Sequence, residues 1–87
     1  MAKNISILGS TGSIGVQSLD VVRNLKLKVS GLSANSNIDL LEKQAREFVP
    51  KVVAINDDSL KDELKSRLKD LPIEVLSGVD GLKAVAA

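Results

Sequence analysis

The stretch Ile5-Ser-Ile-Leu-Gly-Ser-Thr-Gly-Ser-Ile-Gly15 decides how this chain folds. A short apolar run leads into three glycines spaced by three residues, Gly9, Gly12 and Gly15, and an amphipathic segment follows directly. This pattern is typical of a strand that turns into a helix whose N-terminus faces the diphosphate of a dinucleotide. The spacing is G-x-x-G-x-x-G, which differs from the commoner G-x-G-x-x-G.

Each glycine has a separate predicted role. Gly9 lies where the strand turns sharply, Gly12 lets the backbone approach phosphate groups, and Gly15 lets the helix pack tightly on the strand. The N–H groups of the first helical turn then point at the anion, with the hydroxyl groups of Thr11 and Ser13 beside them. The predicted cofactor-binding residues of this turn are Gly9, Ser10, Thr11, Gly12, Ser13 and Ile14. The alternative is a glycine-rich turn that binds no ligand.

The composition limits the kinds of partner and metal that this chain can take. Its 87 residues allow one domain, and the net charge of +1 with a single aromatic residue, Phe48, argues against a nucleic acid partner. The absence of histidine and cysteine excludes disulfides and the usual zinc sites. No apolar run approaches membrane-spanning length and no signal-peptide pattern is present, so we expect a soluble cytoplasmic protein that binds no membrane.

Hydrophobic periodicity predicts strands that alternate with helices. Strands are expected over 4–8, 27–34 and 51–55, helices over 13–24, 38–48 and 59–69, then a short strand over 73–76, a loop or helix entry over 77–81, and the beginning of a helix over 82–87. Alternating units of this kind imply an α/β fold with a parallel sheet, the first three strands in the order 3-2-1. We therefore predict the first half of a Rossmann-like doubly wound sheet (βαβαβα), truncated within a helical pattern that has no stop signal.

Apolar residues at helical spacing predict which helix faces are buried. These residues are Ile14, Leu19, Val21, Val22 and Leu25 in the first helix, Ile38, Leu41, Ala45 and Phe48 in the second, and Leu60, Leu64, Leu68 and Leu71 in the third. Asn37 or Ser36 is the expected cap of the second helix, which Val49-Pro50 ends. At the start of the third helix, Asp57 and Asp58 are expected to act as caps rather than as metal ligands. Its charged residues are expected to face solvent: Lys61, Glu63, Lys65, Arg67 and Lys69.

The residues after the second predicted strand bear on which dinucleotide is bound. A site for NAD usually has an acidic residue there, which accepts hydrogen bonds from the ribose hydroxyls. This chain has Asn35, Ser36 and Asn37 instead, and no acid before Asp39. Amide and hydroxyl donors can bond a 2′-phosphate that a carboxylate would repel, so the loop favours NADP. The alternative is that these three residues only form a turn and cap the next helix.

Four segments carry a resemblance to a known family. The motif Ile7-Leu-Gly-Ser-Thr-Gly-Ser-Ile-Gly15, followed by Ser18-Leu-Asp-Val-Val-Arg23, resembles the N-terminus of the 1-deoxy-D-xylulose 5-phosphate reductoisomerase family. Glu47-Phe-Val-Pro50 and Glu74-Val-Leu-Ser-Gly78 fall where that family has similar segments. The resemblance spans essentially the whole chain and is most specific over residues 5–23.

The resemblance implies that residues 1–87 are part of an N-terminal NADPH-binding domain. The family uses NADPH to rearrange and reduce 1-deoxy-D-xylulose 5-phosphate, a sugar phosphate, to 2-C-methyl-D-erythritol 4-phosphate in non-mevalonate isoprenoid biosynthesis. It needs a divalent metal such as Mg²⁺ or Mn²⁺ and is typically a homodimer. The cofactor contacts that it implies are Thr11, Gly12, Ser13 and Ile14 on the pyrophosphate side, and Asn37 with Asn35 and Ser36 on the adenosine-phosphate side. Many members have a basic pair such as Gly-Lys where this chain has Asn35-Ser36.

In this family the catalytic acids that hold the metal and the substrate-phosphate site lie downstream. The resemblance therefore implies that these 87 residues alone catalyse nothing and bind NADPH weakly or not at all. Because half of a doubly wound sheet has an exposed edge, we also expect the chain to associate with itself. Two alternatives stay open. One is a segment of another NADP-dependent reductase, of the semialdehyde dehydrogenase or dihydrodipicolinate reductase type, and the other is a stand-alone nucleotide-binding module.

Overall fold

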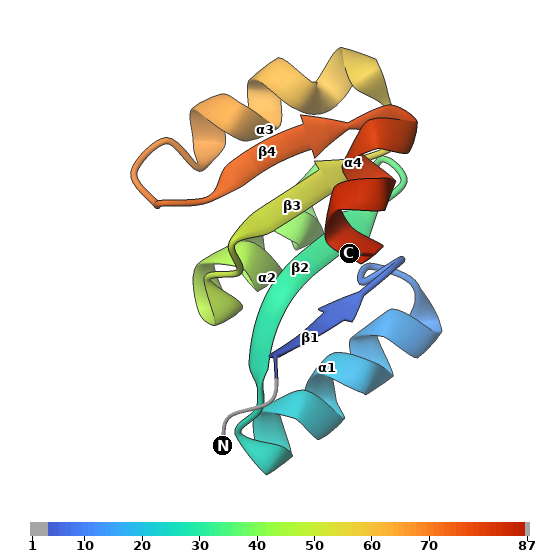
Figure 1. The fold of residues 1–87 in the computed structure, drawn as a ribbon, viewed down its shortest axis with the longest axis vertical. Coiled ribbons are helices and arrows are strands. Elements are labelled where there is room, and N and C mark those ends of the chain that lie inside the picture. The colour runs from blue at the N-terminus through green and yellow to red at the C-terminus, as the bar shows by residue number, and fades with distance from the viewer. Residues whose placement is uncertain (1–3, 87) are drawn as a thin grey trace.

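The computed structural model describes residues 4–86, in which four strands alternate with helices (Figure 1). The elements are β1 (Asn4–Ile7), α1 (Ser13–Leu25), β2 (Lys28–Ala34), α2 (Ile38–Phe48), β3 (Val52–Ile55), the 3-10 turn η1 (Asp58–Leu60), α3 (Lys61–Arg67), β4 (Glu74–Ser77) and α4 (Gly78–Ala86). The predicted α/β fold is confirmed, including the short strand after the third helix. None of the helices within residues 4–86 has the length and apolar character needed to cross a membrane.

The sheet is parallel and its strands follow the order β1-β2-β3-β4. The predicted order of the first three strands is confirmed, and β4 extends the sheet beyond β3. In the register, Ile7 lies beside Leu32, and Ala34 lies beside Ile55, which in turn pairs with Ser77. The carboxyl ends of all four strands therefore share one edge of the sheet, where open α/β sheets bind their ligands.

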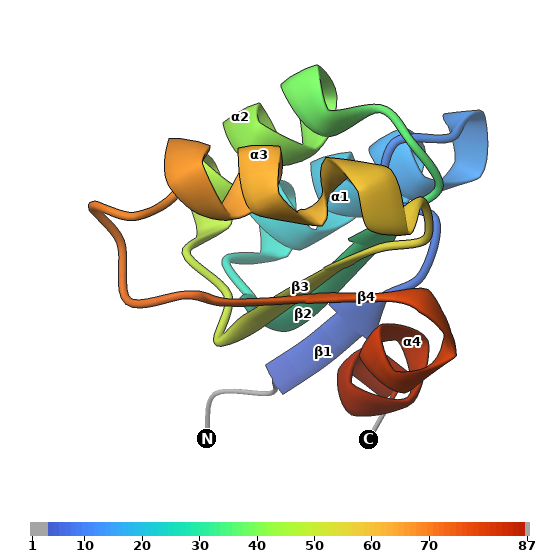
Figure 2. The ribbon, with the colours of Figure 1, turned by 90° about the horizontal axis from the view of Figure 1, so that it is seen from above.

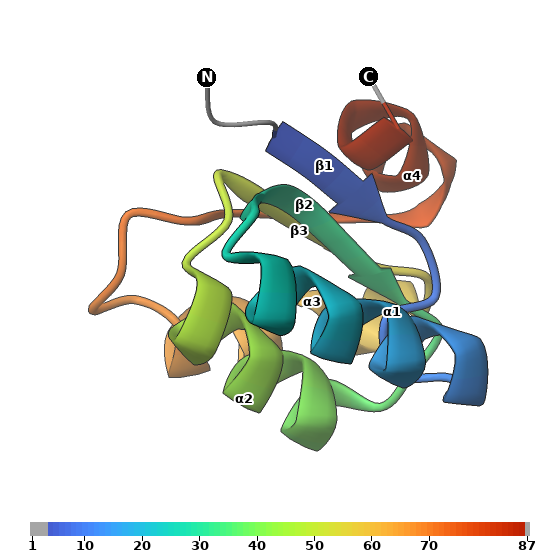
Figure 3. The ribbon, with the colours of Figure 1, turned by 90° about the horizontal axis from the view of Figure 1, so that it is seen from below.

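The helices form two layers of unequal size. Figures 2 and 3 show α1, α2 and α3 on one face of the sheet and α4 alone on the other. Glycines allow α4 to lie close to the strands. A Cβ atom on Gly31 would lie 3.1 Å from a methyl group of Val85, and one on Gly81 would lie 2.9 Å from the Cβ of Ala54. Helices on both faces make the sheet doubly wound.

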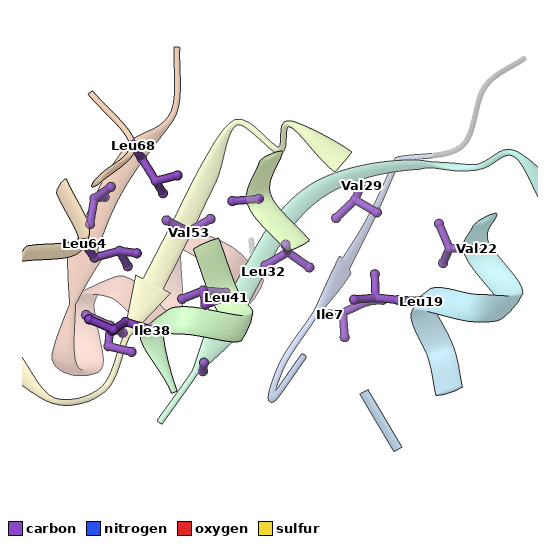
Figure 4. Close-up of a cluster of buried hydrophobic side chains, with 14 residues drawn as sticks. Ile7, Leu19, Val22, Val29, Leu32, Ile38, Leu41, Val53, Leu64 and Leu68 are labelled. Carbon is purple, nitrogen blue, oxygen red and sulfur yellow. The ribbon is translucent and has the colours of Figure 1, made fainter. Parts of the chain in front are cut away.

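The main hydrophobic core lies between the sheet and the layer of α1, α2 and α3 (Figure 4). Its labelled members are Ile7, Leu19, Val22, Val29, Leu32, Ile38, Leu41, Val53, Leu64 and Leu68. The predicted buried faces of the second and third helices are confirmed, with Phe48, Leu60 and Leu71 half-buried at the margin. Within the described residues three polar side chains, those of Ser10, Ser33 and Gln44, are also buried.

The predicted buried face of the first helix is only partly right. Leu19 and Val22 are buried, but Ile14, Val21 and Leu25 are 80%, 55% and 64% exposed. The helix lies over β1, at the margin of the sheet, and within the described residues β1 pairs with β2 alone. A helix at the margin of a sheet contacts the strands through only a narrow part of its surface, so its other apolar residues remain exposed.

Two helix boundaries differ from the prediction. The third helix, expected over 59–69, begins as the 3-10 turn η1, continues as α3 and ends at Arg67. The last helix begins at Gly78, inside the segment 77–81 that the sequence left as a loop or helix entry. Gly78 has a φ of +67°, which lets the chain turn from β4 into α4 without a loop.

The second helix has the predicted bounds, 38–48. Asn37 is its N-cap, with the Leu40 N–H donating to Asn37 Oδ1 at 3.2 Å. Val49 ends it in the left-handed region, with a φ of +44°, directly before Pro50.

Arginines join α2 to both neighbouring helices. Arg23 of α1 donates to Glu47, Arg46 of α2 pairs with Asp70 at 2.9 Å, and Arg67 of α3 pairs with Asp39 at 2.6 Å and with Glu63 at 2.7 Å. The expectation that Arg67 faces solvent is therefore only partly right, because its side chain is 32% exposed and also links α3 to the start of α2.

Candidate dinucleotide-binding site

The turn between β1 and α1 has the predicted sharp bend. Gly9 adopts a φ of +69°, which favours glycine, and the Gly12 N–H donates to the Gly9 carbonyl oxygen at 3.1 Å. The helix starts at once, since the Val16 N–H donates to the Gly12 carbonyl oxygen at 2.8 Å. The predicted conformational role of Gly9 is confirmed.

Gly15 and Gly12 differ in whether the surrounding structure has room for a side chain. A Cβ atom on Gly15 would lie 2.2 Å from the carbonyl oxygen of Gly9 and 2.7 Å from the Cα of Ser10, so only glycine fits there. The nearest neighbour of a Cβ on Gly12 would be the Gly9 oxygen at 3.5 Å, an ordinary contact, and its φ of −79° suits any residue. Packing therefore explains Gly15, whereas Gly12 leaves an open backbone surface at the mouth of the turn.

The N-terminus of α1 has the electrostatic character of an anion site. Among the described residues no side chain caps this helix, and its first turn contains no acidic residue. The amides at the start of an α-helix lack partners within the helix and carry the positive end of its dipole. Gly12, Ser13 and Ile14 are exposed beside them and Thr11 is half-buried, so the chain leaves these amides available to a phosphate group.

The turn is braced from β2 and from α2. The Gly9 N–H donates to Ser33 Oγ at 3.0 Å, and the Ser10 N–H donates to the Ser33 carbonyl oxygen at 2.7 Å. From α2, Gln44 Nε2 donates to the Ser10 carbonyl oxygen at 2.8 Å. Ser10, Ser33 and Gln44 are all buried, so Ser10, one of the predicted cofactor-binding residues, is turned inward and supports the turn from within.

The polar loop 35–37 follows β2 at the same edge of the sheet. Asn35, Ser36 and Asn37 are all exposed. Asn35 Oδ1 accepts a hydrogen bond from Asn56 Nδ2 at 2.9 Å, and the Ser36 carbonyl oxygen accepts one from the Ile38 N–H at 2.9 Å. The capping role is thus confirmed for Asn37, and Asn35 is held by the loop that follows β3.

A shallow cavity of about 390 Å³ lies between the turn and the polar loop. Its lining residues come from four elements or their adjoining loops: Leu8, Gly9, Ser33, Ala34, Asn35, Asn56 and Leu82. A second cavity of about 500 Å³ opens beside the start of α1, where Gly12, Ser13 and Ile14 contribute to its wall. Leu8 and Gly9 line both cavities, so the two cavities adjoin at the turn after β1, at the carboxyl edge of the sheet.

Asp57, the first residue of the acidic pair after β3, forms hydrogen bonds within its own turn. Asp57 Oδ1 accepts hydrogen bonds from the N–H and hydroxyl groups of Ser59, at 3.0 and 2.6 Å, and these bonds lower the pKa of Asp57 below its ordinary value of 3.8. Asp57 therefore caps η1, as predicted. Within residues 4–86 no three or more His, Cys, Asp or Glu side chains lie together in a way that could hold a metal ion.

Several residues around the site were not identified from the sequence. Gln44 gave a usable signal, because it is a polar residue beside the apolar positions Leu41 and Ala45 of a predicted buried face. Ser33 and Asn56 gave none, since small polar residues at strand ends are common. Leu82 was expected in the last helix. Its position beside the turn could not be predicted, because the sequence does not show which face of the sheet that helix covers.

Comparison with known proteins identifies the family. The family model of 1-deoxy-D-xylulose 5-phosphate reductoisomerase matches residues 5–87. A reductoisomerase of that name from Acetivibrio thermocellus is 63% identical over 87 residues, and one from Ruminiclostridium cellulolyticum is 59% identical over 85. These matches cover 100% and 98% of this chain but 23% and 22% of the relatives, so the chain spans about a quarter of their length.

Solved structures agree with this assignment. The reductoisomerase from Zymomonas mobilis in complex with NADPH superposes with a TM-score of 0.91 at 36% identity, covering 98% of this chain and 23% of that one. A reductoisomerase in complex with NADPH, fosmidomycin and magnesium superposes with a TM-score of 0.88 at 31% identity, covering 95% and 21%. Since the family model extends over nearly all of its residues, the chain belongs to the 1-deoxy-D-xylulose 5-phosphate reductoisomerase family.

Proposed function

We propose that residues 1–87 are the N-terminal, NADPH-binding part of an enzyme that rearranges and reduces 1-deoxy-D-xylulose 5-phosphate to 2-C-methyl-D-erythritol 4-phosphate. The observation that carries this proposal is the start of α1. Among the described residues no side chain caps it, its first turn contains no acid, and the backbone at Gly12 is not covered by a side chain. NADPH supplies the hydride for such a reduction, and the residues of this chain bind and orient it. The proposed contacts are Gly9, Ser10, Thr11, Gly12, Ser13 and Ile14 at the diphosphate, and Asn35, Ser36 and Asn37 at the adenosine phosphate.

The fit of a diphosphate rests on the shape of the turn. Gly12 offers backbone without a side chain, although neither its φ nor its packing requires glycine. An open backbone at that point allows phosphate oxygens to approach the amides of the first helical turn. Ser10 is buried, so in this proposal it contributes through its place in the turn rather than through its side chain.

The preference for NADPH over NADH rests on the loop after β2. Its exposed amide and hydroxyl groups, on Asn35, Ser36 and Asn37, can donate hydrogen bonds to a 2′-phosphate. The first acid beyond this loop, Asp39, forms an ion pair with Arg67 at 2.6 Å, so its negative charge is matched by an arginine of α3. Two solved relatives that superpose on this chain are complexes with NADPH, which supports the same choice.

The remaining properties that we propose concern the whole protein. One solved relative is a complex with magnesium and fosmidomycin, and we propose that the whole protein likewise uses Mg²⁺ or Mn²⁺ and a small phosphorylated sugar. The ligands of that metal and the catalytic residues would lie outside these 87 residues. We further propose a homodimer in the bacterial cytoplasm, where NADPH is available.

A chimera tests the proposed function. In it, residues 1–87 replace the matching segment of the Acetivibrio thermocellus relative, which is 63% identical. We expect this chimera to bind NADPH more tightly than NADH and to oxidise NADPH when 1-deoxy-D-xylulose 5-phosphate and Mg²⁺ are added. The 87-residue chain alone should show no turnover and weak or undetectable NADPH binding by titration calorimetry. A folded chimera that binds neither dinucleotide would contradict the proposal.

A further inference from the structure

We infer that Gln44 is a positioning residue for the diphosphate turn, acting through its hydrogen bond to the Ser10 carbonyl oxygen. This inference rests on the proposed NADPH site and adds a residue to it that touches no cofactor. Its place in the chain is remote from the turn, since 34 residues separate Gln44 from Ser10. The contact therefore exists only because α2 packs across the sheet next to α1.

The hydrogen bond is formed inside the protein. Gln44 Nε2 donates to the Ser10 carbonyl oxygen at 2.8 Å, and the two residues are 6% and 0% exposed. A neutral hydrogen bond is stronger where water cannot compete for its donor or acceptor. The bond also complements those from β2, because Ser33 holds the N–H groups of Gly9 and Ser10 whereas Gln44 holds the Ser10 carbonyl.

The choice of glutamine at this position is not explained by stability. Gln44 lies on the buried face of α2 beside Leu41 and Ala45, where a leucine or methionine would bury more apolar surface. Within residues 4–86, the Oε1 atom of Gln44 and the Oγ atom of Ser10 are buried without a hydrogen-bond partner, which lowers the benefit of burying these polar groups. What the amide supplies is a fixed position for the peptide group that precedes Thr11 and Gly12.

Helix α2 packs on the sheet and can therefore position the turn that contains Ser10. It begins at the Asn37 cap, next to the proposed adenosine-phosphate loop, and Gln44 follows about two turns later. Its buried residues Leu41 and Ala45 pack it on the sheet, and exposed ion pairs link Glu47 to Arg23 and Asp39 to Arg67. One helix thus joins the two proposed ends of the cofactor site, and Gln44 is its contact with the diphosphate end.

The test uses Gln44→Met in the chimera described above. Methionine keeps the length of the side chain but cannot donate a hydrogen bond. We expect the KM for NADPH to rise roughly threefold to tenfold, the range for loss of one hydrogen bond, while kcat at saturating NADPH changes little. Tm should also change little, because the added apolar surface offsets the buried Ser10 carbonyl oxygen that loses its partner. The matched control is Lys43→Met, an exposed position on the same helix, which should leave all three quantities unchanged.

A second variant provides a pH signature. In Gln44→Glu, a protonated carboxyl group can donate to the Ser10 carbonyl oxygen, whereas the ionised group repels it, and burial favours the protonated form. The KM for NADPH should therefore approach the parent value at acidic pH and rise as the pH increases, relative to the parent chimera at each pH. If Gln44→Met fails to fold, this profile decides the question.

The outcomes separate this inference from the proposed function. A parent chimera that binds NADPH, with parent KM values for Gln44→Met and a flat relative pH profile for Gln44→Glu, would overturn the positioning role and leave the proposed function intact. A lower Tm with an unchanged KM would likewise assign Gln44 to stability alone. A parent chimera that does not bind NADPH would remove the proposed function, and this inference with it.

Discussion

The hydrogen atom that serves as the side chain of Gly15 points at the carbonyl oxygen of Gly9, and a carbon in its place would lie 2.2 Å from that oxygen. This distance is too short for any Cβ, and the Gly9 oxygen is a backbone atom that cannot rotate away as the end of a side chain could. Helix α1 is therefore in direct contact with the turn before it at Gly15. A substitution at Gly15 should therefore lower stability, whereas one at Gly12, three residues earlier, should lower the affinity for NADPH.

We expect Gly15→Ser to destabilise the protein without removing a ligand contact. The new Cβ forces α1 away from the turn, and overpacking of this kind costs about 1–3 kcal/mol or more. Urea denaturation at equilibrium measures the loss. A Gly15→Ser variant as stable as the parent would show that α1 does not pack on the turn as described.

Gly12→Ser is the matched change and should affect binding instead. Serine is a good N-cap residue, and a Cβ at this position would meet nothing closer than 3.5 Å, so stability should be unchanged or slightly higher. The new side chain occupies the space proposed for the phosphate groups and competes for the same amides. We expect the affinity of the chimera for NADPH to fall about tenfold or more, a change of roughly 1.4 kcal/mol. Unchanged affinity would argue against diphosphate binding at this turn.

Val49 is expected to be a site of backbone strain. It adopts a φ of +44° at the end of α2, a conformation that costs a branched residue about 1–2 kcal/mol. Val49→Asn should therefore stabilise the protein by about 1 kcal/mol, measured as a shift of the urea midpoint at constant slope. Lys26→Asn, at the left-handed end of α1 with a φ of +56°, is the control and should gain less because lysine is not branched at Cβ.

Stability should decrease below about pH 4.5 through Glu47. Hydrogen bonds from Arg23 hold the pKa of Glu47 below its ordinary value of 4.5. Since the folded state binds the proton less readily than the unfolded state, this contribution is complete above pH 4.5 and is lost as the pH falls through the lowered pKa. Glu47→Gln should flatten the dependence of the unfolding free energy on pH in this range.

The 87-residue chain should associate in solution through its apolar margin. Ile14, Val21 and Leu25 are exposed on α1 next to β1, which pairs only with β2 in the described structure. Exposed apolar side chains beside an open strand favour contact between copies. Sedimentation velocity should show species larger than the monomer, and Val21→Lys with Leu25→Lys should shift the distribution toward the monomer. A parent chain that sediments as a clean monomer would contradict this expectation.

The parts of the fold that were predicted well depend on local rules. The second helix was predicted with its observed bounds because a cap, an apolar period and a proline all lie within its own sequence. The bend at Gly9 and the need for glycine at position 15 follow from the same kind of local information. These features require no knowledge of which elements become neighbours.

The parts that were missed depend on contacts between distant elements. Gly78 and Gly81 made residues 77–81 resemble a loop, although Gly81 is required because α4 lies against Ala54 of β3. In the same way, the exposure of Val21 follows from the place of α1 at the margin of the sheet, and Gln44 gains its role only when α2 reaches Ser10. The site residues Asn35, Ser36 and Asn37 were identified by chemistry, and their contacts with a cofactor stay predictions.

The close approach of Gly81 to Ala54 also affects the groove on the carboxyl edge of the sheet. Leu82, the next residue of α4, lines the cavity between the turn and the polar loop. An alanine at position 81 would place its Cβ 2.9 Å from the Cβ of Ala54, so α4 would have to move away from the sheet, and Leu82 would move with it. The width of this cavity thus depends on how closely α4 packs against the opposite face of the sheet.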